Sequence, residues 1–309
     1  MPAIITHHLF GEDASRRLPA DYCFVEEELL AFLLGNQGAD PFYFCFTATP
    51  AAIQACHAFA RVMHEEREVD ALMAARNAAA YLPKEDQGIG RAFALGLAAH
   101  YLLDSEAHAF IHAQEEQLYA IDESLREQQA QVHALIESEL DTWMLWSTRK
   151  LTIADVPAHC NLARTKHVSR IAGTICSQVA HQVFGITLSP DRYEGCLRDY
   201  ELVYRAIDPT GNPYGRMITG AERLGTRHSL LDALSHSDKP TDDCPAANLA
   251  CHPWVDPLTG EENTTSFPDV FYDSLKKWPA LSEAFVQGDQ AMLESLVRRA
   301  YHGSSLAKG

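Results

Sequence analysis

The stretch Leu95-Gly-Leu-Ala-Ala-His100-Tyr-Leu-Leu-Asp104-Ser-Glu-Ala-His108-Ala-Phe-Ile-His112 decides the fold, because it joins a helical pattern to a repeat of polar residues. It contains no proline and is rich in alanine and leucine, which favour a helix. A step of four residues turns a helix by about 40°, so His100, Asp104 and His108 share one narrow face. The apolar residues around that face read as core: Leu95, Leu97, Leu102, Leu103 and Phe110. We infer that the polar face points into the protein or a cleft, where its groups need partners.

A second stripe follows in residues 131–143, where His133, Glu137 and Asp141 again recur every fourth position. Neutral imidazole and carboxylate are donors that zinc accepts, so two such helices can hold metal between them. Either stripe alone is more typical of a surface ion pair or a buried hydrogen-bond network. The two stripes together favour a metal site.

Composition indicates an ordinary globular chain. Its 309 residues are 47% hydrophobic, which is enough for a sizeable core, and its formal net charge is -17. This charge disfavours binding to nucleic acid or to an anionic membrane surface. No run approaches the length of a membrane span, and the start lacks a basic segment followed by a long apolar one, so we expect a cytoplasmic protein. The sequence does not give the oligomeric state.

Eight cysteines are scattered along the chain, at positions 23, 45, 56, 160, 176, 196, 244 and 251. None forms a Cys-x2-Cys pair, so the pattern predicts neither a disulfide framework nor a zinc ribbon. We expect most of them to be small buried hydrophobic residues.

The remaining segments also read as helices, which predicts an all-α multi-helix bundle in a single domain, 1–309. The metal-ligand motifs lie in 1–141, and a helical remainder covers 150–309 with a loop at 240–268, where Pro, Asn and Gly accumulate. Residues 1–22 form an irregular or short helical start. The other expected helices are 24–34, a long region from 50 to about 82, 154–183, 192–207, 214–234, 270–285 and 290–301.

Five motifs in this order resemble those of the bacterial zinc-dependent phospholipase C family. They are Ile5-Thr-His7, Gly38-Ala-Asp40-Pro, Met63-His64, His100-Tyr-Leu-Leu-Asp104-x3-His108 and His133-x3-Glu137. Each motif is weak alone, but the set is specific. The resemblance implies an all-α fold around three zinc ions at the bottom of a cleft, and we expect two to three ions in this chain.

The resemblance also implies a role for each matching residue. His64, His100 and Asp104 would hold one zinc ion, and Asp40 would lie beside it as a ligand or as the catalytic base. His108, His133 and Glu137 would hold a second ion.

His7 would serve a third zinc ion, with Asp104 bridging. In the secreted members, the N-terminal residue completes this third site through its own amino group and carbonyl. The present sequence begins only six residues before His7, without an export signal or an N-terminal Trp, and its spacing from His100 to His108 is shorter by two. The shorter spacing resembles that of a group of intracellular relatives in the family.

The implied reaction is the attack of a zinc-bound hydroxide on phosphorus, which cleaves the headgroup from a phospholipid or another small phosphodiester substrate. Asp40 would accept or orient the proton of the water. The run Phe42-Tyr43-Phe44 is a candidate for an apolar lip, although such a run is more often core.

Two other functions remain open, and a third is disfavoured. The same metal cluster is compatible with a nucleotide or other phosphoester hydrolase, or with a non-catalytic metal-binding scaffold protein. A di-iron bundle is disfavoured, since such sites use Glu-x2-His and the spacing here is His-x3-carboxylate.

Several polar residues lie near the motifs without matching them. We expect His7 rather than its neighbour His8 to face the site. Asp141 is expected to orient an imidazole. His112 lies one turn beyond His108, and we leave it out of the ligand set, while His57 is expected at the surface or in the core.

Overall fold

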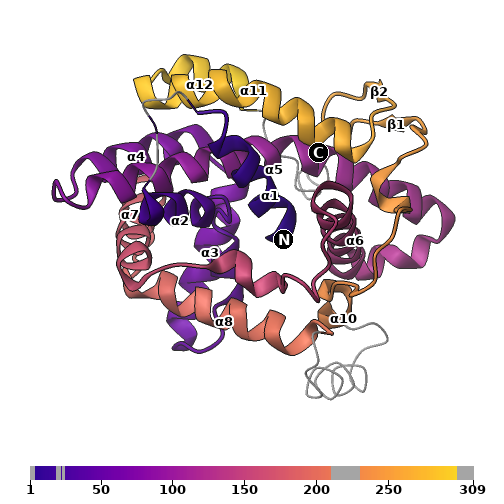
Figure 1. The fold of residues 1–309 in the computed structure, drawn as a ribbon, viewed down its shortest axis with the longest axis horizontal. Coiled ribbons are helices and arrows are strands. Elements are labelled where there is room, and N and C mark those ends of the chain that lie inside the picture. Colours follow the sequence, from indigo (N-terminus) through magenta and orange to yellow (C-terminus); the bar gives the residue numbers. More distant parts are fainter. Residues whose placement is uncertain (1–3, 19–21, 23–24, 210–229, 298–309) are drawn as a thin grey trace.

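The structure is a computed structural model that describes residues 4–18, 22, 25–209 and 230–297. It is built almost entirely from helices, as the sequence predicts (Figure 1). In chain order the main helices are α1 (Ile4–Ser15), α2 (Glu26–Gly35), α3 (Pro50–Glu65), α4 (Glu68–Ala80), α5 (Gln87–Ile121), α6 (Gln129–Arg149), α7 (Lys166–Phe184), α8 (Asp191–Ile207), α10 (Leu230–Leu234), α11 (Phe267–Gln287) and α12 (Gln290–Leu296). Short 3-10 helices occur at η1 (Asp40–Phe44), η2 (Glu123–Gln128), η3 (Ala158–Leu162) and η4 (Pro245–Ala247).

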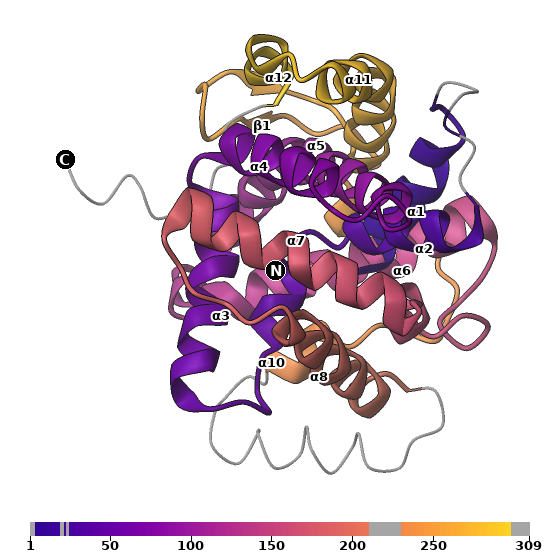
Figure 2. The same ribbon diagram turned by 90° about the vertical axis from the view of Figure 1, so that its left-hand side faces the viewer.

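Helix α5, which contains His100, Asp104 and His108, is the centre of the structure. Residues 92–105 and 107–115 are all buried, so this helix is covered on every side. It packs against α1, α2, α4, α6, α7 and α11. Figures 1 and 2 show α11 and α12 above it and α8 at the opposite end of the molecule.

Two glycines allow the closest of these helix contacts. A Cβ atom on Gly35 would lie 2.3 Å from the carbonyl oxygen of Phe93, and one on Gly96 would lie 2.1 Å from that of Phe32. The backbones of α2 and α5 therefore touch directly. This close contact places the turn after α2 against the polar face of α5, where Gly38 lies beside His100.

The long helical region expected from residue 50 to about 82 is two helices instead of one. Helix α3 ends at Glu65, and α4 begins at Glu68. Between them, Arg67 has a φ of 56° and donates a hydrogen bond of 2.7 Å to the carbonyl oxygen of Val183 on α7. A contact with a distant helix thus fixes a break that local sequence does not show.

The second half of the chain also differs in detail from expectation. The helix expected at 154–183 begins at Lys166, because Thr165 caps α7 by accepting a hydrogen bond from the Val168 N–H. The expected loop at 240–268 contains a small antiparallel pair, β1 (Trp254–Val255) and β2 (Glu262–Asn263). Residues 214–229 and 298–301 of two expected helices lie outside the described residues.

No helix within the described ranges combines the length and apolar character that crossing a bilayer requires.

A buried ionic cluster fixes the start of α1 on α6. The carboxylate of Asp141 accepts hydrogen bonds from the backbone N–H groups of Ile5, at 2.9 Å, and Thr6, at 2.7 Å. Its negative charge also suits the positive end of the helix dipole. His236 lies 3.2 Å from Asp141 and 3.1 Å from Asp208, so its ring links α6 to the end of α8.

His236 is charged in this cluster. Burial lowers the pKa of its imidazole, but the charge of Asp208 and the hydrogen bond to Asp141 outweigh burial and raise the pKa to about 10. A histidine with a raised pKa in the folded state stabilises the fold fully below its unfolded value, near 6.5, and this contribution is lost as the pH rises through 10.

The substitution His236→Gln should therefore lower the free energy of unfolding by about 3–5 kcal/mol at neutral pH, since it leaves buried carboxylates without their partner. The difference between the wild type and this variant should shrink as the pH rises from about 6.5 to 10. Denaturant unfolding across this pH range measures it, with His181→Gln on the exposed face of α7 as the control. A difference that stays constant with pH would contradict the charged state of His236.

Candidate metal centre

The residues expected to bind metal converge from five elements on the polar face of α5. His100, Asp104 and His108 come from α5 itself. The others are His7 from α1, Asp40 from η1, His64 from α3, and His133 and Glu137 from α6. All of them are buried, with exposed fractions between 0% for His100 and 9% for His133. Their donor atoms fall into three groups, each within 4.8 Å.

The first group consists of Asp40, His64 and His100. The Nε2 atom of His64 lies 3.0 Å from a carboxylate oxygen of Asp40. His100 donates from Nδ1 to the carbonyl oxygen of Asn36 at 3.1 Å, in the turn after α2. This bond fixes the orientation of the ring and leaves the Nε2 lone pair directed at the group.

The second group consists of His7, His100 and Asp104, so His100 belongs to both groups. The ring centroids of His7 and His100 lie 4.3 Å apart, and His7 Nε2 lies 3.9 Å from Asp104 Oδ1. The neighbouring His8 instead faces Glu12 on its own helix, at 3.7 Å. The structure therefore places His7, and not His8, beside the α5 stripe.

The third group consists of His108, His133 and Glu137. The two imidazole rings are stacked with centroids 5.4 Å apart, and His133 Nε2 lies 3.1 Å from Glu137 Oε1. The Nδ1 atom of His108 lies 3.1 Å from Oδ1 of Asp104. Asp104 thus stands between the second and third groups.

Burial and neighbouring charges shift the pKa values of several of these side chains toward the protonation states that bind a cation. Burial lowers the pKa of His7 to about 3 and also lowers that of His100, so both imidazoles are neutral. Burial opposes ionisation of Asp104, but the charge and hydrogen bond of His108 hold its pKa well below the ordinary value. Neutral imidazole and ionised carboxylate are the forms that bind a metal ion.

Asp40 and His64 form a coupled pair. Burial raises the pKa of Asp40, but the hydrogen bond from His64 outweighs it and keeps the pKa below its ordinary value. In return, Asp40 overcomes the effect of burial on His64 and raises the pKa of its imidazole to about 9. Asp40 is consequently ionised.

Buried polar atoms without hydrogen-bond partners give an independent test of whether these residues suit a bound metal ion. Within the described part of the chain, four buried ligand atoms of this cluster have no hydrogen-bond partner: His7 Nδ1, His100 Nε2, Asp104 Oδ2 and Glu137 Oε2. Leaving such atoms unsatisfied costs about 1–3 kcal/mol each. Several imidazole and carboxylate atoms facing one another without partners fit the donor set of zinc.

Glu115 is a functional candidate that the sequence pattern did not single out. Its two carboxylate oxygens lie 2.7 Å from His133 Nδ1 and 2.6 Å from His112 Nδ1. A carboxylate on Nδ1 orients an imidazole so that its Nε2 can bind metal. The sequence could have indicated Glu115 only through its spacing of three residues from His112. Its contact with His133 depends on how α5 packs against α6.

His112 lies beside the third ligand group, whereas Asp141 lies outside all three. His112 gathers with Glu115 and His133, with its ring centroid 5.4 Å from that of His133. The imidazole that Asp141 contacts is that of His236, which no sequence motif indicates. Asp141 acts on the centre indirectly, because it holds the start of the helix that carries His7.

The aromatic run after Asp40 divides between core and surface. Phe42 and Phe44 are buried, whereas Tyr43 is half-buried. The Tyr43 ring stacks on His64 with centroids 5.9 Å apart. Of these three residues, only Tyr43 is placed to form a lip beside the cluster.

Gly38 sets how closely the turn after α2 approaches His100. Its φ of 57° is left-handed, and a Cβ atom there would lie 2.3 Å from His100 Nε2. We expect Gly38→Ala to displace this ring and to lower both metal content and stability, as measured by elemental analysis and unfolding. Gly185→Ala is a matched control, since Gly185 has a φ of 68° with nothing within 4 Å of the added carbon. Equal effects of the two substitutions would show that the contact with His100 is unimportant.

Comparison with known proteins places this geometry in a family. No curated protein and no solved structure is similar enough to count as a match. The family described as zinc dependent phospholipase C matches residues 6–181, which is more than half of the chain and includes all three donor groups. The chain therefore belongs to the zinc-dependent phospholipase C family.

Proposed function

We propose that this protein hydrolyses phosphodiesters and that its substrate is a phospholipid, cleaved between the glycerol and the phosphorylated headgroup. The observation that supports this most strongly is the joining of three donor groups through His100 and Asp104 in one buried cluster. The family of the chain supplies the reaction type.

We further propose that the three groups hold two to three zinc ions. Asp40, His64 and His100 would share one ion, with Asp104 reaching it from the adjacent group. His108, His133 and Glu137 are the proposed ligands of a second ion, and His7 is the proposed ligand of a third, together with His100 and Asp104. When bound, the ions would stabilise negative charge on the phosphoryl oxygens and make water a nucleophile at neutral pH.

Asp40 is the proposed proton acceptor. It is ionised, 2% exposed, and held by a hydrogen bond from His64. Asp40 is the first residue of η1, directly after the turn that follows α2. In this role, Asp40 takes the proton of the attacking water or orients that water toward phosphorus.

The proposed position of the substrate follows from the lip that Tyr43 forms beside the cluster. The half-buried ring of Tyr43 covers one face of His64. An aromatic ring with a hydroxyl group can contact both the apolar and polar parts of a lipid at such a boundary. The phosphate would then lie between Tyr43 and the donor groups.

The number of metal ions is the first test. Elemental analysis of the purified protein should find two to three zinc ions per chain, and His133→Ala should remove about one and lower the melting temperature, because metal binding also stabilises the fold. His181→Ala, at an exposed position, should change neither quantity. A protein that contains no zinc and takes up none on addition would rule out the assignment of these residues.

The second test concerns the reaction. With phosphatidylcholine as substrate, Asp40→Asn should lower kcat by about 10²–10⁴-fold, the usual contribution of a positioned acid or base, with a smaller change in KM. Asp86→Asn is the matched control, since Asp86 is also buried but pairs with His167 and Arg170. Its rate should be unchanged.

A substrate panel separates the proposed function from its alternatives. Turnover of nucleotide esters without turnover of phosphatidylcholine would replace the lipid substrate with a nucleotide. Full zinc content with no turnover of any phosphodiester would indicate a metal-binding scaffold.

A further inference from the structure

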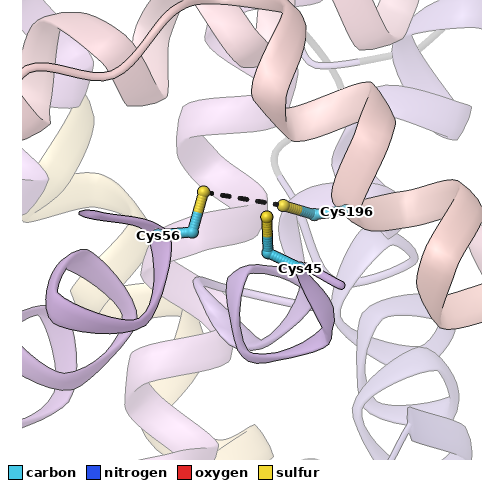
Figure 3. A group of neighbouring side chains, drawn as sticks. All are labelled: Cys45, Cys56 and Cys196. Carbon is cyan, nitrogen blue, oxygen red and sulfur yellow. Dashed lines mark hydrogen bonds between the residues drawn. The ribbon is translucent and has the colours of Figure 1, made fainter. Parts of the chain in front are cut away.

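Three cysteines from separate parts of the chain meet in the core and form a group that shares no residue with the zinc donor groups. Cys45 follows η1, Cys56 lies on α3 and Cys196 lies on α8, and Figure 3 shows their sulfur atoms pointing toward one another. The three Sγ atoms lie within 4.8 Å of one another, and those of Cys56 and Cys196 are 3.9 Å apart. All three residues are buried, with at most 3% exposed.

Contacts on both sides of Cys45 hold this three-cysteine cluster together. Before it, the ring of Phe44 stacks on Tyr200 of α8 with centroids 3.9 Å apart. After it, the carboxylate of Asp199 accepts hydrogen bonds from the backbone N–H groups of Phe46, at 2.7 Å, and Thr47, at 2.8 Å. Asp199 lies one helical turn after Cys196, so these contacts bring the two cysteines together.

The spacing of the sulfur atoms suits a bound ion. Three sulfur atoms around one ion in a plane, with metal–sulfur bonds of about 2.3 Å, are about 4.0 Å apart. The distance of 3.9 Å between Cys56 and Cys196 matches this value, and the two other sulfur pairs lie within 4.8 Å. A disulfide would require the sulfur atoms to approach to about 2.05 Å and would leave one of the three cysteines unpaired.

The donor set indicates which ion. Thiolate is a soft ligand that selects monovalent copper and zinc over hard cations. Structural zinc takes four ligands, and among the residues that the structure describes no fourth Cys, His, Asp or Glu joins this group. A soft ion that accepts three sulfur ligands is the better fit.

We propose that Cys45, Cys56 and Cys196 bind one monovalent copper ion through their three sulfur atoms. This site shares no residue with the zinc centre and does not depend on the proposed function. Copper enters as Cu(I) and stays in that oxidation state. Each cysteine that is still a thiol releases its proton to solvent when it binds the ion, and no oxidant or reductant is needed.

The protonation of the cluster is compatible with this binding. A hydrogen bond from Cys196 lowers the pKa of the Cys56 thiol to about 7, so this residue supplies a thiolate near neutral pH. Burial raises the pKa of Cys45 to about 11. The hydrogen bond to Cys56, together with burial, raises the pKa of the Cys196 thiol well above its ordinary value. The metal therefore has to displace the protons of Cys45 and Cys196.

The experiment is an anaerobic titration of the zinc-loaded, full-length protein with Cu(I) in the presence of bicinchoninate as a competing chelator. The wild type should bind one copper ion per chain without losing zinc, and X-ray absorption should show three sulfur neighbours. The variants Cys45→Ser, Cys56→Ser and Cys196→Ser should each weaken binding by more than about 100-fold, since loss of an outer-shell partner alone costs about 10–100-fold.

Cys176→Ser is the matched control, because Cys176 is also buried and free but lies outside the cluster. It should keep the affinity of the wild type. Melting curves show whether each variant is folded, and the sulfur count in the wild type does not depend on any variant. The proposal is overturned if the chelator removes copper as easily from the wild type as from Cys56→Ser. It is also overturned if the site takes zinc instead, or if the isolated protein contains a disulfide between Cys56 and Cys196.

Discussion

The structure depends on one constraint: helix α5 has to bury imidazole and carboxylate groups in a region where hardly any solvent reaches them. Such groups are costly in a core unless each finds a partner. The chain meets this requirement by bringing other elements to the stripe, with His7 on α1, Asp40 on η1 and His133 on α6. The arrangement of helices around α5 is therefore also the arrangement of donor atoms.

Positioning of the donors depends on residues that are not donors themselves. Asn36 holds the ring of His100 through a backbone carbonyl, and Glu115 holds His133 through a carboxylate. Asp141 acts at a greater distance, since it holds the backbone at the start of α1. These contacts explain how atoms with lone pairs directed at a common centre can persist in a core.

Sequence periodicity predicts the parts of this structure that lie within single helices. The spacing of four residues alone places His100, Asp104 and His108 on one helix face. The family resemblance adds Asp40 and His64, which no local periodicity indicates. Contacts between distant segments are beyond this reasoning. His236 meets Asp141 across 95 residues, Cys56 meets Cys196 across 140, and no spacing in the sequence signals either contact. The break at Arg67 belongs to the same class, because the carbonyl that fixes it is on α7.

The two donor sets share two supporting elements, η1 and α3, although they share no residue. Asp40 opens η1 and Cys45 follows its end, while Cys56 and His64 lie two turns apart on α3. An ion bound by the three cysteines would tie η1 and α3 to α8, and the first two of these elements carry Asp40 and His64. The sulfur atoms are soft donors and the zinc centre offers only nitrogen and oxygen, so each set can select its own ion. Because a metal ion stabilises the conformation that binds it, occupancy of the sulfur site would make the positions of Asp40 and His64 more rigid.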